Sequence, residues 1–90
     1  MAMLGMDIEQ VDGFAAMLGQ RAGDIDGIIS QIQGKWSQVN TPSVWAGADA
    51  SHFDQVWQDC SKNLGIVAQA LRDAEAEARR QIEGQQHASS

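Results

Sequence analysis

The residues that could carry chemistry in this sequence are few and widely spaced. His52 follows Asp49 by three positions, so on a helix the two side chains would share a face and could bind a metal ion or pair a base with its orienting carboxylate. No third ligand and no nucleophile stands at a matching spacing. An aspartate near a helix N-terminus also complements the helix dipole without any ligand. We therefore expect no metal site, no cofactor and no catalytic residue.

The single cysteine, Cys60, falls in a row of apolar residues, and this position predicts a buried, unreactive thiol. A group of charged residues between Arg72 and Arg80 mixes both signs and contains Glu75 four positions before Arg79. That order and spacing stabilise a solvent-exposed helix. The sequence has no phosphate-binding loop, nucleophile elbow or paired-carboxylate cleft. We therefore predict that the protein is not an enzyme.

Length and charge narrow the remaining classes of function. The 90 residues make one domain, and 43% apolar against 20% charged residues is typical of a globular chain. Twelve acidic and six basic residues give a net charge of −6, which argues against nucleic acid and against an anionic membrane surface as partners. Residues 1–5 lack the positive charge and apolar run of a signal peptide, and no stretch approaches the roughly 20 apolar residues of a transmembrane segment.

The sequence predicts two long helices separated by a turn. Pro42 stands in a turn-rich stretch near the middle of the chain, and proline is a poor residue inside a helix. Asp7 suits the N-cap of the first helix, and Gly84 suits the end of the second. The predicted segments are a helix over about 7–39, a turn over 40–47, a helix over about 48–82 and a polar tail over 83–90.

Apolar residues recur three and four positions apart on both sides of the turn, which predicts two amphipathic helices. The first row is Ile8, Val11, Ala15, Leu18, Ala22, Ile25, Ile29, Ile32, Trp36 and Val39. The second row is Phe53, Trp57, Cys60, Leu64, Val67, Leu71, Ala74 and Ala78. A short connection between long helices favours opposite directions, so the predicted fold is all-α, an antiparallel helical hairpin.

Further apolar residues flank both rows, so each helix has a face wide enough to contact two neighbours. Exposing several large apolar side chains together favours association, and small domains without disulfides often depend on it. We therefore predict that two hairpins pair into a dimeric four-helix bundle; the alternative is that the flanking residues are scattered surface apolars. The residues expected to pack the hairpin and the dimer are Phe14, Leu18, Ile25, Ile28, Ile29, Ile32, Trp36, Phe53, Val56, Trp57, Leu64, Val67 and Leu71.

Glycines recur four positions apart at Gly19, Gly23 and Gly27 in the first predicted helix. Each costs about 1 kcal/mol relative to alanine inside a helix. Two interpretations stay open, namely close approach of another helix or an exposed face that tolerates glycine.

The most informative local feature is Trp45-Ala46-Gly47 in the predicted turn. A bulky aromatic residue at this point can close the end of the groove between two helices. Gly47 permits a backbone conformation or a close approach that a side chain would block.

With this turn, the chain resembles the WXG family, the small early-secreted-antigen-like proteins exported by type VII (ESX-type) secretion systems. The resemblance covers about residues 7–82 and rests on Trp45 and Gly47 between two heptad-patterned helices. It implies a helical hairpin that pairs into a homodimer, or into a heterodimer with a related small protein. It also implies a non-enzymatic protein that is secreted without a signal peptide from a cytoplasmic pool, acts as a virulence factor or escorts cargo, and contacts a secretion ATPase.

One departure from the family pattern is that this chain contains no tyrosine, whereas many exported members carry Tyr-x-x-x-Asp/Glu after the second helix. A looser export pattern is matched by Leu71, Glu75, Ala78 and Ile82, although any heptad would match it. The resemblance therefore leaves two functions open. The first is a secreted substrate or export partner. The second is an intracellular chaperone or adaptor for a larger LXG-type toxin.

Overall fold

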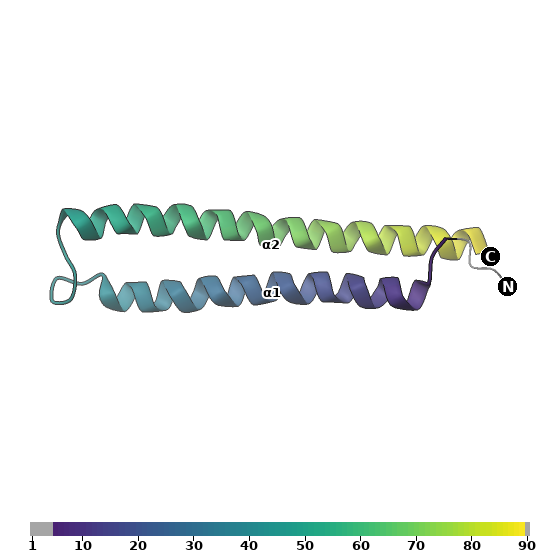
Figure 1. Ribbon diagram of the computed structural model, residues 1–90, viewed down its shortest axis with the longest axis horizontal. Coiled ribbons are helices and arrows are strands. Elements are labelled where there is room, and N and C mark those ends of the chain that lie inside the picture. Colours follow the sequence, from purple (N-terminus) through teal and green to yellow (C-terminus); the bar gives the residue numbers. More distant parts are fainter. Residues whose placement is uncertain (1–4, 90) are drawn as a thin grey trace.

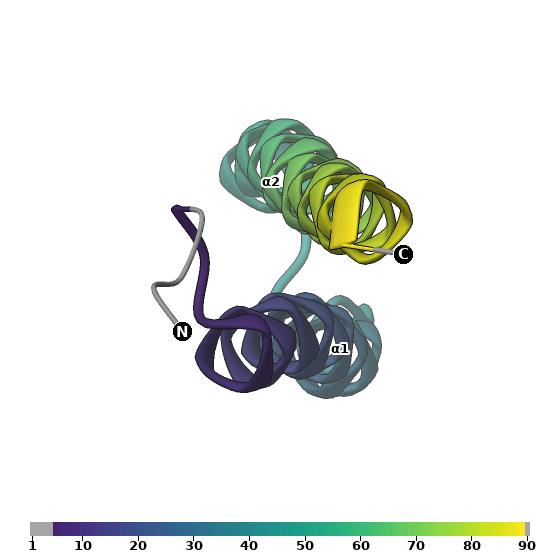
Figure 2. The ribbon, with the colours of Figure 1, turned by 90° about the vertical axis from the view of Figure 1, so that its right-hand side faces the viewer.

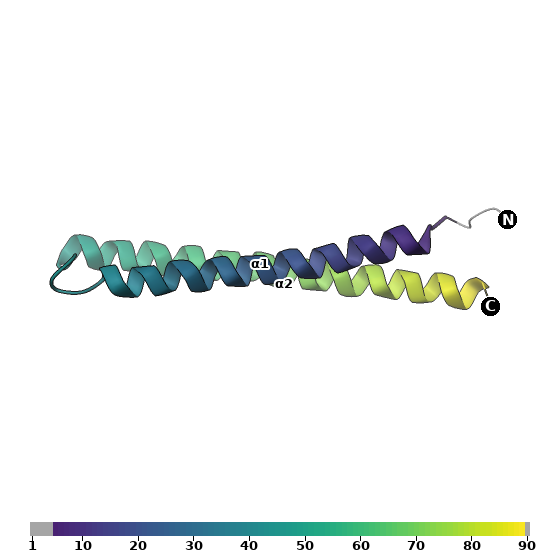
Figure 3. The same ribbon diagram turned by 90° about the horizontal axis from the view of Figure 1, so that it is seen from below.

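The computed structural model describes residues 5–89 and contains two long helices, α1 over Ile8–Val39 and α2 over Ala48–Ser89. The helices lie side by side in opposite directions, with the start of α1 and the end of α2 at the same end (Figure 1). Viewed along the long axis they form a single pair (Figure 2), and from below they cross at a shallow angle (Figure 3). The hairpin measures 68 × 16 × 14 Å. The predicted all-α helical hairpin is confirmed.

α1 begins with the predicted N-cap. The Asp7 carboxylate accepts a hydrogen bond from the backbone N–H of Gln10 at 3.2 Å, and the Gln10 side-chain amide donates to the other carboxylate oxygen at 3.1 Å. The cap therefore gives a partner to one of the backbone N–H groups that the first turn leaves unpaired.

The turn between the helices is closed by its own backbone. The carbonyl of Thr41 accepts hydrogen bonds from the N–H groups of Val44 and Trp45, at 3.1 and 3.0 Å. Gly47 has a φ of 95°, in the left-handed region that a side chain strains, and its carbonyl accepts the Ser51 N–H at the start of α2. The expectation that Gly47 provides a special backbone conformation is confirmed.

The predicted polar tail over 83–90 is wrong within the described residues, because α2 continues through Gly84 to Ser89. Gly84 keeps a negative φ and costs the helix only about 1 kcal/mol. No proline or other strong helix breaker follows it. The half-buried Gln85, one turn beyond the buried Ile82, indicates that this extension still lies against the rest of the hairpin.

The contact between α1 and α2 is built largely on small residues. Alanines occupy the most deeply buried positions, with Ala15, Ala22 and Ala68 fully covered. Trp36 and Trp57 fill the space near the turn, where each is about 95% covered. Because alanine lets two helices approach closely, the interface is narrow, and most large apolar side chains remain partly outside it.

The row on α2 that faces α1 differs from the predicted one. Trp57, Leu64, Leu71 and Ala78 turn toward α1 as expected. The other half of the predicted row is exposed: Phe53, Cys60, Val67 and Ala74. Their places are taken by small or polar residues one position further along: Asp54, Ser61, Ala68 and Glu75. These residues suit a close interface with hydrogen bonds, whereas the exposed ones form a second apolar row.

Candidate functional site: the two sides of the hairpin and its turn

One side of the α1–α2 contact is polar. The Arg79 guanidinium lies 2.9 Å from the Asp12 carboxylate on α1 and 3.0 Å from the Glu75 carboxylate on its own helix. Arg72 forms a second ion pair between the helices, with Asp26. The predicted Glu75–Arg79 pair is therefore present, and Arg79 also links the two helices.

Two side chains on α2, Arg79 and Glu77, have shifted pKa values. Hydrogen bonds to Glu75 and then Asp12 raise the pKa of Arg79, which stays charged. Hydrogen bonds from Gln81 and then Arg80 lower the pKa of Glu77 below its ordinary value. Both groups are solvent-exposed, so these shifts reflect local pairing and not a catalytic environment.

Near the turn, two tryptophans link the helices through their indole N–H groups. Trp36 of α1 donates to the Asp54 carboxylate of α2 at 2.7 Å. Trp57 of α2 donates in the other direction, to the Gln33 amide oxygen of α1 at 2.6 Å. Because each donor has an acceptor on the opposite helix, the pair fixes the axial register of the hairpin.

The Trp-x-Gly turn closes this end through aromatic contacts. Trp45 packs edge-on against Trp36, with ring centroids 5.6 Å apart, and lies 5.4 Å from Phe53. Trp36 and Phe53 are 4.9 Å apart, so the three rings contact one another. Trp45 thus occupies the end of the groove between α1 and α2, as the sequence predicts.

The other side of the hairpin is apolar along much of its length, and we call it the apolar face. On α1, Asp26 and Gln33 make polar contacts with α2 and stand four positions after Ala22 and Ile29, which face α2. On α2, the polar contacts with α1 come from Asp54, Arg72 and Arg79. On both helices, residues three positions after those that face the other helix lie on the opposite flank. Ile32 of α1 and Phe53 of α2, both on that flank, line one pocket, so the two flanks share a side. Its large members are each 40–51% exposed: Phe14, Ile28, Ile32, Phe53, Val56 and Val67. Leu18 and Ile25 are half-buried beside them.

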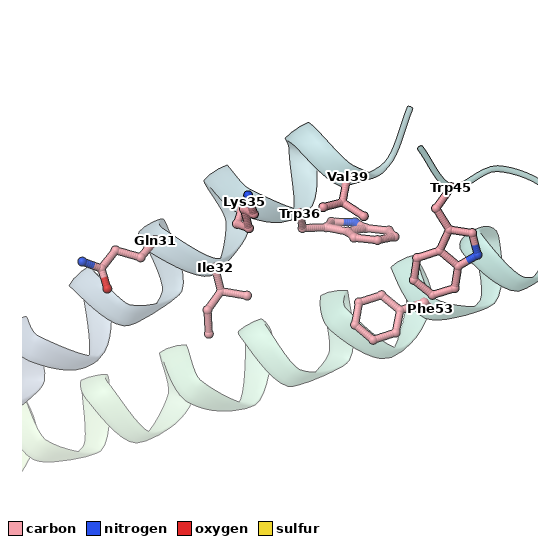
Figure 4. A pocket seen from close by; sticks show the side chains of 7 residues that line it. All are labelled: Gln31, Ile32, Lys35, Trp36, Val39, Trp45 and Phe53. Carbon is pink, nitrogen blue, oxygen red and sulfur yellow. The ribbon is translucent and has the colours of Figure 1, made fainter. Parts of the chain in front are cut away.

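At the turn end, the apolar face is hollowed into a pocket of about 410 Å³. Its walls are Ile32, Trp36, Val39, Trp45 and Phe53, with Gln31 and Lys35 at its rim. Ile32 and Phe53 point into the space between the helices, and Trp45 closes its turn side (Figure 4). The pocket contains no carboxylate and provides no pair of groups for acid–base chemistry.

The residues with potential chemistry do not come together. Cys60 is exposed on the apolar face, so the predicted buried thiol is wrong for the hairpin. His52 and Asp49 are both exposed at the start of α2. Within residues 5–89, no group of three or more His, Cys, Asp or Glu side chains could hold a metal ion.

The four residues that match the looser export pattern lie toward α1. Leu71, Glu75 and Ala78 are half-buried, and Ile82 is buried. Glu75 also lies over Gly19, where an added Cβ would clash with its carboxylate. A signal read from these side chains would therefore require α2 to part from α1 near its open end.

The glycine row has two different environments. Gly19 permits close approach of Glu75, in agreement with one of the two interpretations. At Gly23 and Gly27 an added Cβ would meet nothing within 4 Å, so within the described hairpin these two positions fit the other interpretation.

Gln33 and Asp54, the acceptors for the indole groups, were not identified from sequence. Both look like ordinary surface residues of an amphipathic helix. The sequence nevertheless contained a signal for both acceptors. Gln33 stands three positions before Trp36, and Asp54 stands three positions before Trp57, so each lies beside a tryptophan on its own helix.

Comparison with known proteins identifies no relative. No protein-family model matches the chain, and no significant match was found among curated proteins or solved structures. Within the described residues, no helix is both long and apolar enough to cross a membrane.

Proposed function

We propose that this chain is a non-enzymatic helical hairpin that pairs through its apolar face into a dimeric four-helix bundle. The observation that carries the proposal is the row of six large, half-exposed apolar side chains on one side of the hairpin. Covering the exposed half of each would contribute on the order of 1 kcal/mol per side chain. Ion pairs occupy the opposite side, which suits contact with water.

We further propose that the protein, in this bundle, is a substrate or export partner of a type VII (ESX-type) secretion system. This part of the proposal is supported by the Trp45–Gly47 turn, whose tryptophan packs on both helices and whose glycine has a positive φ. The partner is a second copy or a related small helical protein. A secretion ATPase would then contact the assembled bundle, and the export signal would include Leu71, Glu75, Ala78 and Ile82.

Mass in solution tests the pairing. We expect light scattering after size exclusion, over a tenfold concentration range, to give twice the 9.7 kDa monomer mass. A monomer at every concentration would contradict the homodimer and would direct the search to a heterologous partner.

Export is tested separately, in a host with an active type VII system and in the same host lacking its ATPase activity. We expect the tagged chain in the culture supernatant of the first host only. The variant Trp45→Ala should be exported less, whereas Val44→Ala, which removes an exposed apolar side chain of the same turn, should be exported normally.

The second candidate is an intracellular adaptor for a larger LXG-type toxin. The absence of tyrosine and the partial burial of the looser export pattern favour it. Under this alternative the chain stays in the cells and copurifies with the toxin's N-terminal helices.

A further inference from the structure

The pocket at the turn end of the apolar face is not explained by the hairpin itself. A second cavity, on the polar side, is lined by Asp12, Arg79 and their neighbours, and the ion pair already accounts for it. The turn-end pocket instead leaves Ile32 and Phe53 about 40% exposed. Its volume of about 410 Å³ is ample for an aromatic ring, since a cavity of about 150 Å³ holds benzene.

We propose that this pocket receives Phe14 of a second copy of the chain, which packs on the apolar face in the opposite direction. The proposal rests on the pairing described under the proposed function and adds its geometry. Phe14 is the more exposed of the two phenylalanines, at 51%, and it stands two heptads before Ile28 on the same flank of α1. The apolar face therefore carries a projecting ring near its open end and a hollow at its turn end.

The axial positions of ring and pocket match when two copies run in opposite directions. Phe14 lies six residues from the first residue of α1, and Gln33 lies six residues from the last. A copy related by a two-fold axis through the centre of α1 therefore brings Phe14 level with Gln33 of its partner, beside Ile32 at the edge of the pocket. If the two copies ran in the same direction, the pocket of one would face the pocket of the other, and both pockets would stay unfilled.

Charge at the ends of the face favours the same arrangement. Lys35, at the rim of the pocket, makes no ion pair with any described residue. Asp7 stands one heptad before Phe14, at the open end. Opposed copies bring the acidic end of one face to the basic rim of the other, whereas copies running in the same direction bring the two Lys35 ammonium groups together.

Truncation of the ring tests the contact. We expect Phe14→Ala to weaken the dimer at least about 100-fold by sedimentation equilibrium, because both pockets lose their occupant. The control is Ile66→Ala, which removes a side chain that is 58% exposed. Ile66 stands one position before Val67, so the helix turns it about 100° from that member of the apolar face. We expect this variant to change the dissociation constant less than about threefold. Circular dichroism should show unchanged helix content for both variants, since Phe14 is half-exposed in the hairpin.

The native cysteine tests the direction. Trp57 bonds to Gln33, so these two residues lie at the same level along the hairpin. Cys60 stands three positions after Trp57, and because the helices run in opposite directions it lies near the level of residue 30 on α1. In opposed copies the two thiols would be about 20 Å apart, far beyond disulfide reach. In copies running in the same direction they would meet near the two-fold axis. We therefore expect mild oxidation of the dimer to give no Cys60–Cys60 disulfide.

The outcomes separate this inference from the proposed function. A dimer that tolerates Phe14→Ala, or one that forms the Cys60 disulfide, would overturn the inference and leave pairing intact. A monomer at every concentration would overturn both. A dimer sensitive to Phe14→Ala but not to Ile66→Ala, with both thiols reduced, would support it.

Discussion

The same substitution, glycine to alanine, should have opposite effects at two positions of this hairpin. Gly23 lies inside α1 with a negative φ, and a Cβ added there would meet nothing within 4 Å. Gly47 lies in the turn with a φ of 95°, a conformation that strains any other residue. Alanine at 23 removes only the excess flexibility of glycine, whereas alanine at 47 must adopt the strained conformation or distort the turn.

The expected sizes follow from these environments. Gly23→Ala should raise the free energy of unfolding by about 0.5–1 kcal/mol. Gly47→Ala should lower it by about 1–2 kcal/mol, with no steric clash involved. For a chain of this length, 1 kcal/mol corresponds to about 4–8 °C in the melting temperature.

Thermal unfolding followed by circular dichroism, at one fixed chain concentration, measures both effects. Gly27→Ala is a second test of the same reasoning, because its Cβ position is also open. If Gly23→Ala lowered the melting temperature or the mass of the dimer, the outer side of α1 would have to be packed against another helix. The exposed-face explanation of this glycine row would then be refuted.

Three further perturbations test individual hydrogen bonds and ion pairs of α2. Trp57→Phe removes the indole donor to Gln33 and part of a buried ring, and should cost more than about 1 kcal/mol in urea unfolding. Arg72→Gln breaks a half-exposed pair with Asp26 and should cost less than about 1 kcal/mol at low salt and still less at 1 M salt; Arg80→Gln, within one helix, is its control. The lowered pKa of Glu77 means that its stabilisation is complete above its ordinary pKa of 4.5 and is lost as the pH falls through and below that value. Melting temperatures of the wild type and Glu77→Gln should therefore differ at neutral pH and converge in acid.

The two helices and the turn could be predicted from the sequence because each is specified by residues close together in the chain. Asp7 caps α1, the stretch around Pro42 ends it, and Gly47 permits the positive φ before α2. The end of α2 was predicted too early, since a single glycine weakens a helix by about 1 kcal/mol but does not stop it.

What only the tertiary structure decided is which side of each apolar row faces the other helix. Residues three and four positions after Trp57 lie on opposite flanks, and the heptad pattern of the sequence does not distinguish the flank that is buried. Ala68 allows close approach and Asp54 accepts the Trp36 indole N–H, so α2 turns these residues inward and leaves Cys60 and Val67 outside. The exposure of Cys60 and Val67 on the apolar face is a consequence of that rotation, because it depends on contacts between residues far apart in the chain.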